Sequence, residues 1–146
     1  MRAERRKHEG DAADAIISFQ TAAETLAYEL WALLLADEGL SEAEIASCRE
    51  AGLSFRSLLS CELAHRLGGQ WDLSLDRPAV GRYWARLYVM RNRVVHAGYL
   101  PHDGDADEAE AAFVEFDRFL DYQLRSKAKQ FPRAARAKLE GPGTGS

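Results

Sequence analysis

Hydrophobic residues recur at alternating steps of three and four along almost the whole chain, which is the rhythm of an amphipathic helix. The first such stripe predicts a helix over about residues 12–37, with Asp11 as its N-cap and Gly39 as its stop. The stripe comprises Ile16, Phe19, Ala23, Leu26, Leu30 and Leu33, widened by Ala27, Trp31 and Leu34.

Three further helices are expected in the middle of the chain. Ser41 and Glu44 have the spacing of a capping box, which predicts a short helix over about residues 42–51. Apolar residues then recur every four positions and predict a helix over about residues 54–67, ended by Gly68 and Gly69. Asp76 is expected to cap the next helix, which ends near Gly98 and carries Val80, Tyr83, Leu87, Met90 and Val94.

The C-terminal part of the chain predicts one more helix and a tail. After an acidic turn at residues 102–107, this helix is expected to bury Phe113, Phe116, Leu120 and Leu124. Pro132 interrupts the pattern, and residues 131–146, basic and then rich in Gly and Pro, are expected to be disordered. With residues 1–10 as a basic lead, residues 11–130 form the expected domain, an all-α antiparallel bundle of four to five helices.

Composition narrows the class of protein. The chain has 146 residues, 47% of them hydrophobic, which is enough for one domain with a core. It contains neither an apolar run of the roughly 18 residues that span a membrane nor a secretory signal. Two cysteines, Cys48 and Cys61, are too few for a disulfide framework or a zinc finger. We therefore expect a soluble cytoplasmic protein without a membrane partner.

Charge is distributed unevenly along the chain. The net charge of −4 combines +2 in residues 1–10, +5 in residues 123–140 and −11 between them. Such a chain is not a globally basic nucleic-acid binder, although a local basic surface is compatible with it. The basic C-terminal segment is expected to be mobile, or else to bind RNA or a partner protein.

One segment carries candidate chemistry, at the end of the helix that holds Tyr83 and Leu87. It reads Arg91-Asn92-Arg93-Val94-Val95-His96-Ala97-Gly98-Tyr99. Asn92 and His96 are four residues apart and share a helix face, so the amide can orient the imidazole. The long Arg91 side chain can reach the same cleft, and the helix C-terminus favours a protonated imidazole.

The segment Arg91-Asn92-x-x-x-His96 resembles the R-x(4–6)-H motif of the HEPN superfamily (higher eukaryotes and prokaryotes nucleotide-binding domains). The all-helical setting and the place of the motif at the end of the penultimate long helix resemble that family as well. The resemblance extends over about residues 11–125. It implies a HEPN-like bundle.

This resemblance implies a metal-independent endoribonuclease that needs no cofactor. Many HEPN domains are homodimers in which two motif copies meet and the ribose 2′-OH attacks the neighbouring phosphorus. His96 would serve as general acid or base, Arg91 would stabilise charge on the phosphorane, and Asn92 would hold the histidine or a phosphate oxygen. Members often act in toxin–antitoxin or antiviral defence systems, so RNA and an antitoxin or other partner protein are the implied partners.

Four further residues near the motif are candidates for RNA contact. Arg82, Arg86 and Arg93 lie on one helical stripe and could follow an RNA backbone, or else pair with the acidic body. Tyr99 could stack on a base or pack beneath the loop. In one HEPN branch, a tyrosine two residues after the histidine is adenylylated by a partner enzyme, but Tyr99 is three residues after His96 and departs from that pattern.

Two other interpretations remain open. One is a non-catalytic HEPN module that binds nucleotides or a partner, and the other is a helical interaction protein unrelated to RNA, in which Arg91 and His96 are ordinary helix-end residues. Glu62-x-x-His65 has the spacing of a di-iron ligand pair, but the chain has no second Glu-x-x-His, so we expect no metal site.

Overall fold

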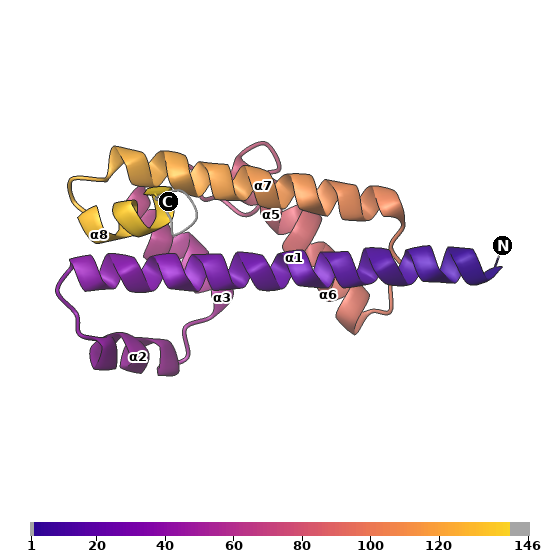
Figure 1. Ribbon diagram of the computed structural model, residues 1–146, viewed down its shortest axis with the longest axis horizontal. Helices are drawn as coiled ribbons and strands as arrows, with labels where there is room; N and C mark the ends of the chain where they lie inside the picture. Colours follow the sequence, from indigo (N-terminus) through magenta and orange to yellow (C-terminus); the bar gives the residue numbers. More distant parts are fainter. Residues whose placement is uncertain (1, 141–146) are drawn as a thin grey trace. The chain divides into compact units, whose positions relative to one another are not determined.

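The computed structural model describes residues 2–140, with side chains from Gly10 onwards, and all regular structure in that range is helical (Figure 1). Residues 2–140 contain no strand. The all-α class predicted from the hydrophobic rhythm is therefore confirmed. Within the same range, no helix combines the length and the apolar character needed to cross a membrane.

The first helix is longer than predicted. α1 spans Arg2–Asp37, so Asp11 lies inside the helix and is not its N-cap. Residues 2–9 consist mainly of Arg, Lys, Glu and Ala, which favour helix, and this composition accounts for the earlier start. The expected basic lead is thus continuous with α1. The predicted end is confirmed, because the helix stops at Asp37 and Gly39 follows in a left-handed conformation.

The short second helix forms as predicted. α2 spans Glu42–Glu50, and both hydrogen bonds of the capping box between Ser41 and Glu44 are present. The predicted helix over residues 54–67 is present as three consecutive elements, α3 (Phe55–Ser57), η1 (Leu58–Leu63) and α4 (Ala64–Leu67). Of these, η1 is π-helical, so the turns widen in the middle of the helix.

The helix that carries the motif is also continuous through a π-helical stretch. It comprises α5 (Ala79–Tyr83), η2 (Trp84–Tyr88) and α6 (Val89–His96). Its N-cap is Pro78 and not Asp76. The reason is steric, because a proline disfavours helical geometry in the residue before it, so the helix cannot begin ahead of Pro78.

The C-terminal segment differs most from its prediction. α7 spans Asp103–Ser126, and a further helix, α8 (Pro132–Ala135), continues into η3 (Arg136–Glu140). Phe131 is only 1% exposed, and the Asp37 carboxylate accepts hydrogen bonds from the backbone N–H groups of Arg133 and Ala134. Residues 131–140 are therefore folded, and the expectation of a disordered tail is wrong for them. Its Gly/Pro-rich end, residues 141–146, lies outside the described residues.

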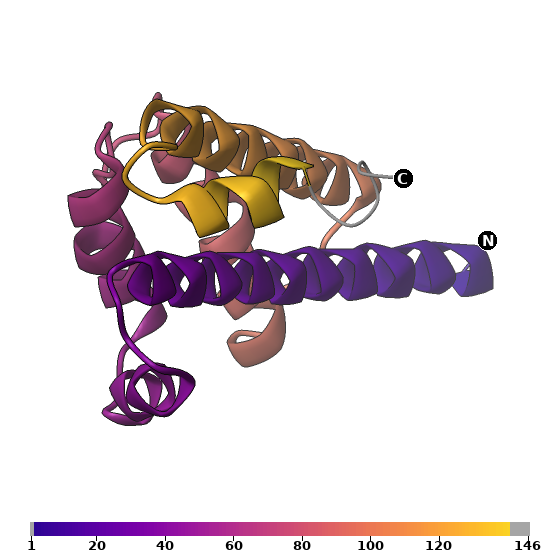
Figure 2. The same ribbon diagram turned by 60° about the vertical axis from the view of Figure 1, so that its left-hand side comes forward.

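The chain divides into two compact units, where the pattern predicted one domain over residues 11–130. The first unit comprises Met1–Ala23 and Asp72–Asp117, and the second comprises Glu24–Trp71 and Arg118–Ser146. In the first unit, the rings of Phe19 in α1 and Phe113 in α7 stack with centroids 6.0 Å apart. There α1 and α7 run in the same direction (Figures 1 and 2). The predicted antiparallel arrangement therefore does not hold for this pair.

The core of the first unit forms around Tyr83. Its ring stacks on Phe116 with centroids 4.4 Å apart, and its hydroxyl donates to the Gln20 side chain at 2.5 Å. Both Tyr83 and Gln20 are buried, so the polar groups of the core satisfy each other. The contacts fix the motif-bearing helix against α1 and α7 within this unit.

The second unit has an aromatic and leucine-rich core. Trp31 of α1 donates its indole N–H to Glu62 at 2.9 Å, and Glu62 also accepts from Arg66, which binds Glu38 through two further hydrogen bonds. The buried side chains include Leu30, Leu34, Leu58, Leu59, Leu63, Leu67, Trp71, Leu120 and Leu124. By contrast, α2 has no buried residue.

Candidate functional site

The candidate motif lies in the last two turns of α6, in the first unit. Arg91 and Asn92 are half-buried, whereas His96, the last residue of the helix, is exposed. Arg91 and His96 are five residues apart, which places them about 140° apart around the helix axis. Asn92 and His96 are only about 40° apart and share a face. The arginine must therefore bend toward that face if the two are to act on one ligand.

A hydrogen bond directs Arg91 toward Asn92. The Nη1 of Arg91 donates to the Oδ1 of Asn92 at 3.1 Å. The Nε of Arg91 is buried and has no hydrogen-bond partner among the described residues. A buried N–H without a partner is costly, so this guanidinium retains hydrogen-bonding capacity for a ligand. The structure therefore brings Arg91 and Asn92 together, whereas it shows no contact of either residue with His96 among the described residues.

The imidazole of His96 has no hydrogen-bond or ion-pair partner within the described part of the chain, and the expected bond from Asn92 is not formed there. The Asn92 carbonyl oxygen instead accepts from Arg91. His96 is therefore accessible and unconstrained, which leaves both ring nitrogens available to exchange protons with a bound molecule.

Tyr99 is held against the end of α6. Gly98 adopts a positive φ of 68°, which turns the chain so that the N–H of Tyr99 donates back to the carbonyl of Arg93. The Arg93 guanidinium lies over the Tyr99 ring, 4.3 Å from its centroid. Of the two roles expected for Tyr99, this geometry corresponds to packing beneath the loop.

A buried carboxylate organises the loop between α6 and α7. Asp105 is 8% exposed, and its Oδ2 accepts hydrogen bonds from the Tyr99 hydroxyl at 2.8 Å and from the His102 N–H at 3.1 Å. The Nε2 of His102 lies 3.4 Å from the same oxygen. The hydrogen bond to Asp105 raises the pKa of Tyr99 above its usual value, with desolvation as a second cause.

The three arginines proposed to follow an RNA backbone have different environments. Arg82 forms an ion pair with Glu115 at 2.5 Å, and this hydrogen bond raises the pKa of Arg82. Arg93 covers Tyr99, as described above. Arg86 is exposed and has no ion-pair partner among the described residues. The pairing with the acidic body that was one of the alternatives is therefore observed for Arg82.

Apolar side chains are exposed around the motif. Val95 and Leu100 are 47% and 70% exposed, and Val89 at the start of α6 is also exposed. These residues lie on the same element as His96 or directly after it. These exposed apolar side chains are available for contact with a partner.

Sequence reasoning missed Asp105 and Glu115. Both lie in α7, where they resemble the solvated carboxylates around them. The one available signal for Asp105 is its position three residues after His102 at the start of a helix, where a carboxylate can accept from backbone N–H groups.

The Glu62 and His65 pair forms no metal site in the described part of the chain. Glu62 binds Trp31 and Arg66, and His65 is exposed. Residues 10–140, whose side chains are described, hold no group of three or more His, Cys, Asp or Glu residues arranged to bind a metal ion.

Comparison of the chain with family models, with curated proteins and with solved structures finds no match. The functional interpretation therefore depends on the chemistry of the motif and on its setting in the first unit.

Proposed function

We propose that the chain is a HEPN-type, metal-independent endoribonuclease in which Arg91, Asn92 and His96 form the active site. The observation that carries the proposal is that one helix end holds both an accessible, unpartnered imidazole and a guanidinium bonded to Asn92, whose buried Nε has no partner among the described residues. An all-helical chain with this motif at the end of a long helix is what the family resemblance implies.

The chemistry requires only these side chains and the RNA. One imidazole removes the proton from the ribose 2′-OH, and the 2′-oxygen forms a bond to the adjacent phosphorus. Charge that develops on the phosphorane oxygens is stabilised by the forked donors of Arg91. The bond from phosphorus to the 5′-oxygen then breaks, and a protonated imidazole supplies the proton to that oxygen. The products carry a 2′,3′-cyclic phosphate and a free 5′-OH.

The reaction uses one acid and one base, and each chain contributes one motif histidine. A two-fold dimer that brings two α6 ends together supplies His96 twice, along with two copies of Arg91. The exposed Val89, Val95 and Leu100 around the motif provide the apolar contact for such a dimer. The proposed site is therefore composite, and it forms at the interface of a homodimer.

RNA cleavage in excess EDTA tests the proposal. Wild type is compared with His96→Ala and Arg91→Ala, and with His65→Ala and Arg118→Ala as matched exposed controls in the second unit. We expect cyclic-phosphate products from the wild type and both controls, and loss of at least about a hundredfold in rate in the two motif variants. Cleavage that survives in folded motif variants, or no cleavage of any RNA in a broad panel that includes tRNA, contradicts the proposal.

The dimer is tested separately by Val95→Asp, with Val114→Asp on α7 as the control. We expect Val95→Asp to give a monomer in sedimentation experiments and to abolish cleavage, because a charge in an apolar contact is costly to desolvate. A wild type that is monomeric at every concentration, or an active Val95→Asp monomer, contradicts the composite site.

A non-catalytic HEPN module that binds a nucleotide or a partner is the second candidate. The observation that favours it is the engagement of Arg82 by Glu115 and of Arg93 by Tyr99, which reduces the cationic surface available for a long RNA. A folded dimer that binds nucleotides through Arg91 but cuts no RNA would support this candidate. For the active enzyme, we propose a role in toxin–antitoxin or antiviral defence and a cytoplasmic location.

A further inference from the structure

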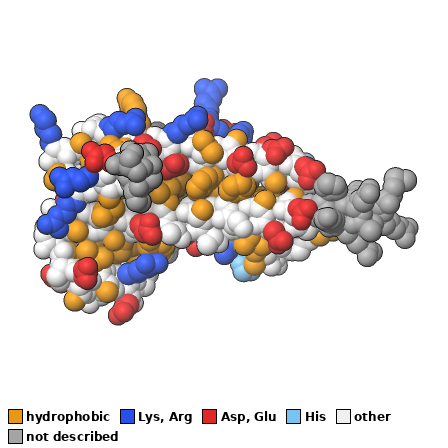
Figure 3. All heavy atoms as spheres, in the orientation of Figure 1, with side chains coloured by type: hydrophobic (Ala, Val, Ile, Leu, Met, Phe, Trp, Pro, Cys, Tyr) orange, Lys and Arg blue, Asp and Glu red, His pale blue; other side chains and the backbone are white. Residues whose placement is uncertain are grey.

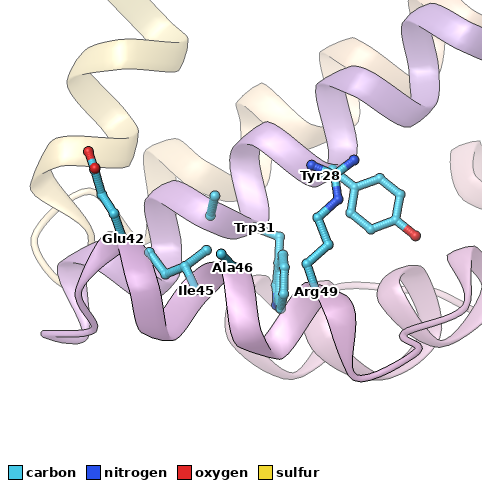
Figure 4. Close-up of a pocket in the computed structure, with 7 residues that line it drawn as sticks. Tyr28, Trp31, Glu42, Ile45, Ala46 and Arg49 are labelled. Carbon is cyan, nitrogen blue, oxygen red and sulfur yellow. The ribbon is translucent and has the colours of Figure 1, made fainter.

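A hollow of about 300 Å³ lies between α1 and α2, within the second unit (Figure 4). Tyr28, Trp31 and Ala32 line it from α1, and Glu42, Ile45, Ala46 and Arg49 from α2. No residue of α2 is buried, so this helix covers α1 only loosely. Both ribbon views show α2 beside the C-terminal part of α1 (Figures 1 and 2). In the space-filling view, hydrophobic atoms gather over this part of the molecule with acidic side chains around them (Figure 3).

The aromatic wall of the hollow is rigid. Trp31 is 2% exposed, and its N–H is fixed by Glu62 at 2.9 Å. Tyr28 packs edge-on against Trp31 with ring centroids 6.4 Å apart, and its hydroxyl donates to the carbonyl of Leu53 at 3.2 Å. The polar atoms of both rings are therefore engaged elsewhere; the half-buried Tyr28 ring presents carbon surface to the hollow, and Trp31 lines it with a small part of its surface.

The Arg49 guanidinium lies at one end of this apolar surface. The Arg49 guanidinium carbon lies 4.5 Å from the centroid of the Tyr28 ring (Figure 4). No carboxylate among the described residues forms an ion pair with Arg49. Its forked N–H donors remain available to an anion, and the ring beneath holds the planar group in place.

We propose that this hollow, defined by Tyr28, Trp31, Ile45, Ala46 and Arg49, binds a small amphiphilic carboxylate. The carboxylate pairs with Arg49, and an apolar ring or short alkyl chain lies against Trp31, Ile45 and Ala46. A volume of about 300 Å³ is at the lower end of the range for small-molecule pockets.

The charges of α2 favour a ligand with one negative charge over a phosphate dianion. Arg49 is the one cation of α2, whereas Glu42, Glu44 and Glu50 are carboxylates of the same helix. Figure 4 shows Glu42 at the far end of the row from Arg49, so a second negative charge has no cation to meet there. The site is independent of the proposed ribonuclease chemistry, since none of its residues belongs to the motif.

Binding is measured by NMR on the full chain, with the indole N–H resonance of Trp31 as the reporter. The probes are phenylbutyrate, its alcohol phenylbutanol and the cation phenylbutylamine. We expect phenylbutyrate to shift the Trp31 resonance at millimolar concentration, and the alcohol to bind about tenfold more weakly, because it lacks the charged hydrogen bond. The amine is expected to bind most weakly.

Two variants separate the parts of the site. Arg49→Gln should weaken phenylbutyrate about tenfold and leave phenylbutanol unchanged, while the control Arg118→Gln should affect neither. Ala46→Leu should weaken both probes, because the added carbons fill the hollow. The proposal is overturned if phenylbutyrate leaves the Trp31 resonance unmoved, if the alcohol or the amine binds as tightly as the acid, or if Arg49→Gln binds phenylbutyrate like the wild type.

Discussion

The Tyr99 hydroxyl donates a 2.8 Å hydrogen bond to Oδ2 of Asp105 across the loop that joins α6 to α7. The same oxygen also accepts from the backbone N–H of His102. A single buried carboxylate thereby fixes both the residue that follows the motif and the entry to α7. These two hydrogen bonds to Asp105, called the clasp below, tie the segment that follows α6 to the first turn of α7.

Removal of the Asp105 carboxylate should destabilise the first unit. Asp105→Ala leaves the Tyr99 hydroxyl and the His102 N–H without their acceptor, at an expected cost of about 1–3 kcal/mol in the free energy of unfolding. Asp103→Ala, an exposed neighbour, is the control and should cost less than about 0.5 kcal/mol. Urea denaturation measures both, and equal effects of the two substitutions would contradict the role of the clasp.

Tyr99 should titrate above the ordinary tyrosine pKa, because the neutral phenol donates to Asp105 and ionisation would remove that bond. A raised pKa in the folded state means that this contribution to stability is present below the unfolded pKa of about 10 and is lost as pH rises through the folded pKa. Ultraviolet titration of wild type minus Tyr99→Phe isolates this group. In Asp105→Asn the difference curve should move to lower pH, and an unchanged curve would contradict the assignment.

Most helix positions were predictable because the local signals act within a few residues. The capping box of Ser41 and Glu44 and the stop after Leu67 involve only neighbouring residues. The folded segment at residues 131–140 was not predictable in this way. It depends on Asp37, nearly a hundred residues earlier, which supplies the acceptors for the first N–H groups of α8. Without the Asp37 carboxylate, the basic, proline-containing sequence of residues 131–140 gives no local sign that it folds.

The sequence predicts that the motif residues lie near one another at a helix end, but it does not predict their contacts. The motif spacing identifies Arg91, Asn92 and His96 as neighbours on one helix. The spacing does not reveal that the Asn92 oxygen accepts from Arg91. Both Arg91 and His96 carry N–H donors, and either could reach this oxygen. The relative direction of α1 and α7 in the first unit was also not predictable, since helical periodicity specifies which face is buried and not which way the helix runs.

Arg82 and Arg86 should contribute differently to RNA binding, if the chain binds RNA as proposed. Arg86 is free of ion pairs among the described residues, so Arg86→Gln should lower the slope of log affinity against log salt by about 1. Arg82→Gln should lower it less, because Glu115 already neutralises that charge. Fluorescence anisotropy over a salt series measures both slopes, and a larger effect at Arg82 would contradict the structure.

Gly81→Ala should be strongly destabilising. A Cβ at this position would lie 1.5 Å from the carbonyl oxygen of Leu75, and the clash with backbone cannot be relieved by a rotamer change. We expect a cost of at least about 2 kcal/mol, at the upper end of overpacking. Gly10→Ala, a helical position with nothing within 4 Å of the added carbon, should stabilise by about 0.5–1 kcal/mol. Thermal unfolding distinguishes the two, and a neutral Gly81→Ala would contradict the packing of the loop before α5.

Phe131 anchors the C-terminal segment in the second unit, where it is 1% exposed. Phe131→Ala should lower the free energy of unfolding by about 3–5 kcal/mol, through lost burial and the cavity left behind. Asp37→Ala should cost about 0.5–2 kcal/mol, because it removes the cap on the N–H groups of Arg133 and Ala134.

Chains ending at residue 140 and at residue 130 complete the test by denaturation. Relative to the chain ending at residue 140, the chain ending at residue 130 should lose at least as much stability as Phe131→Ala removes from the full chain. Equal stability of the two truncations would show that residues 131–140 contribute nothing, as a mobile tail would.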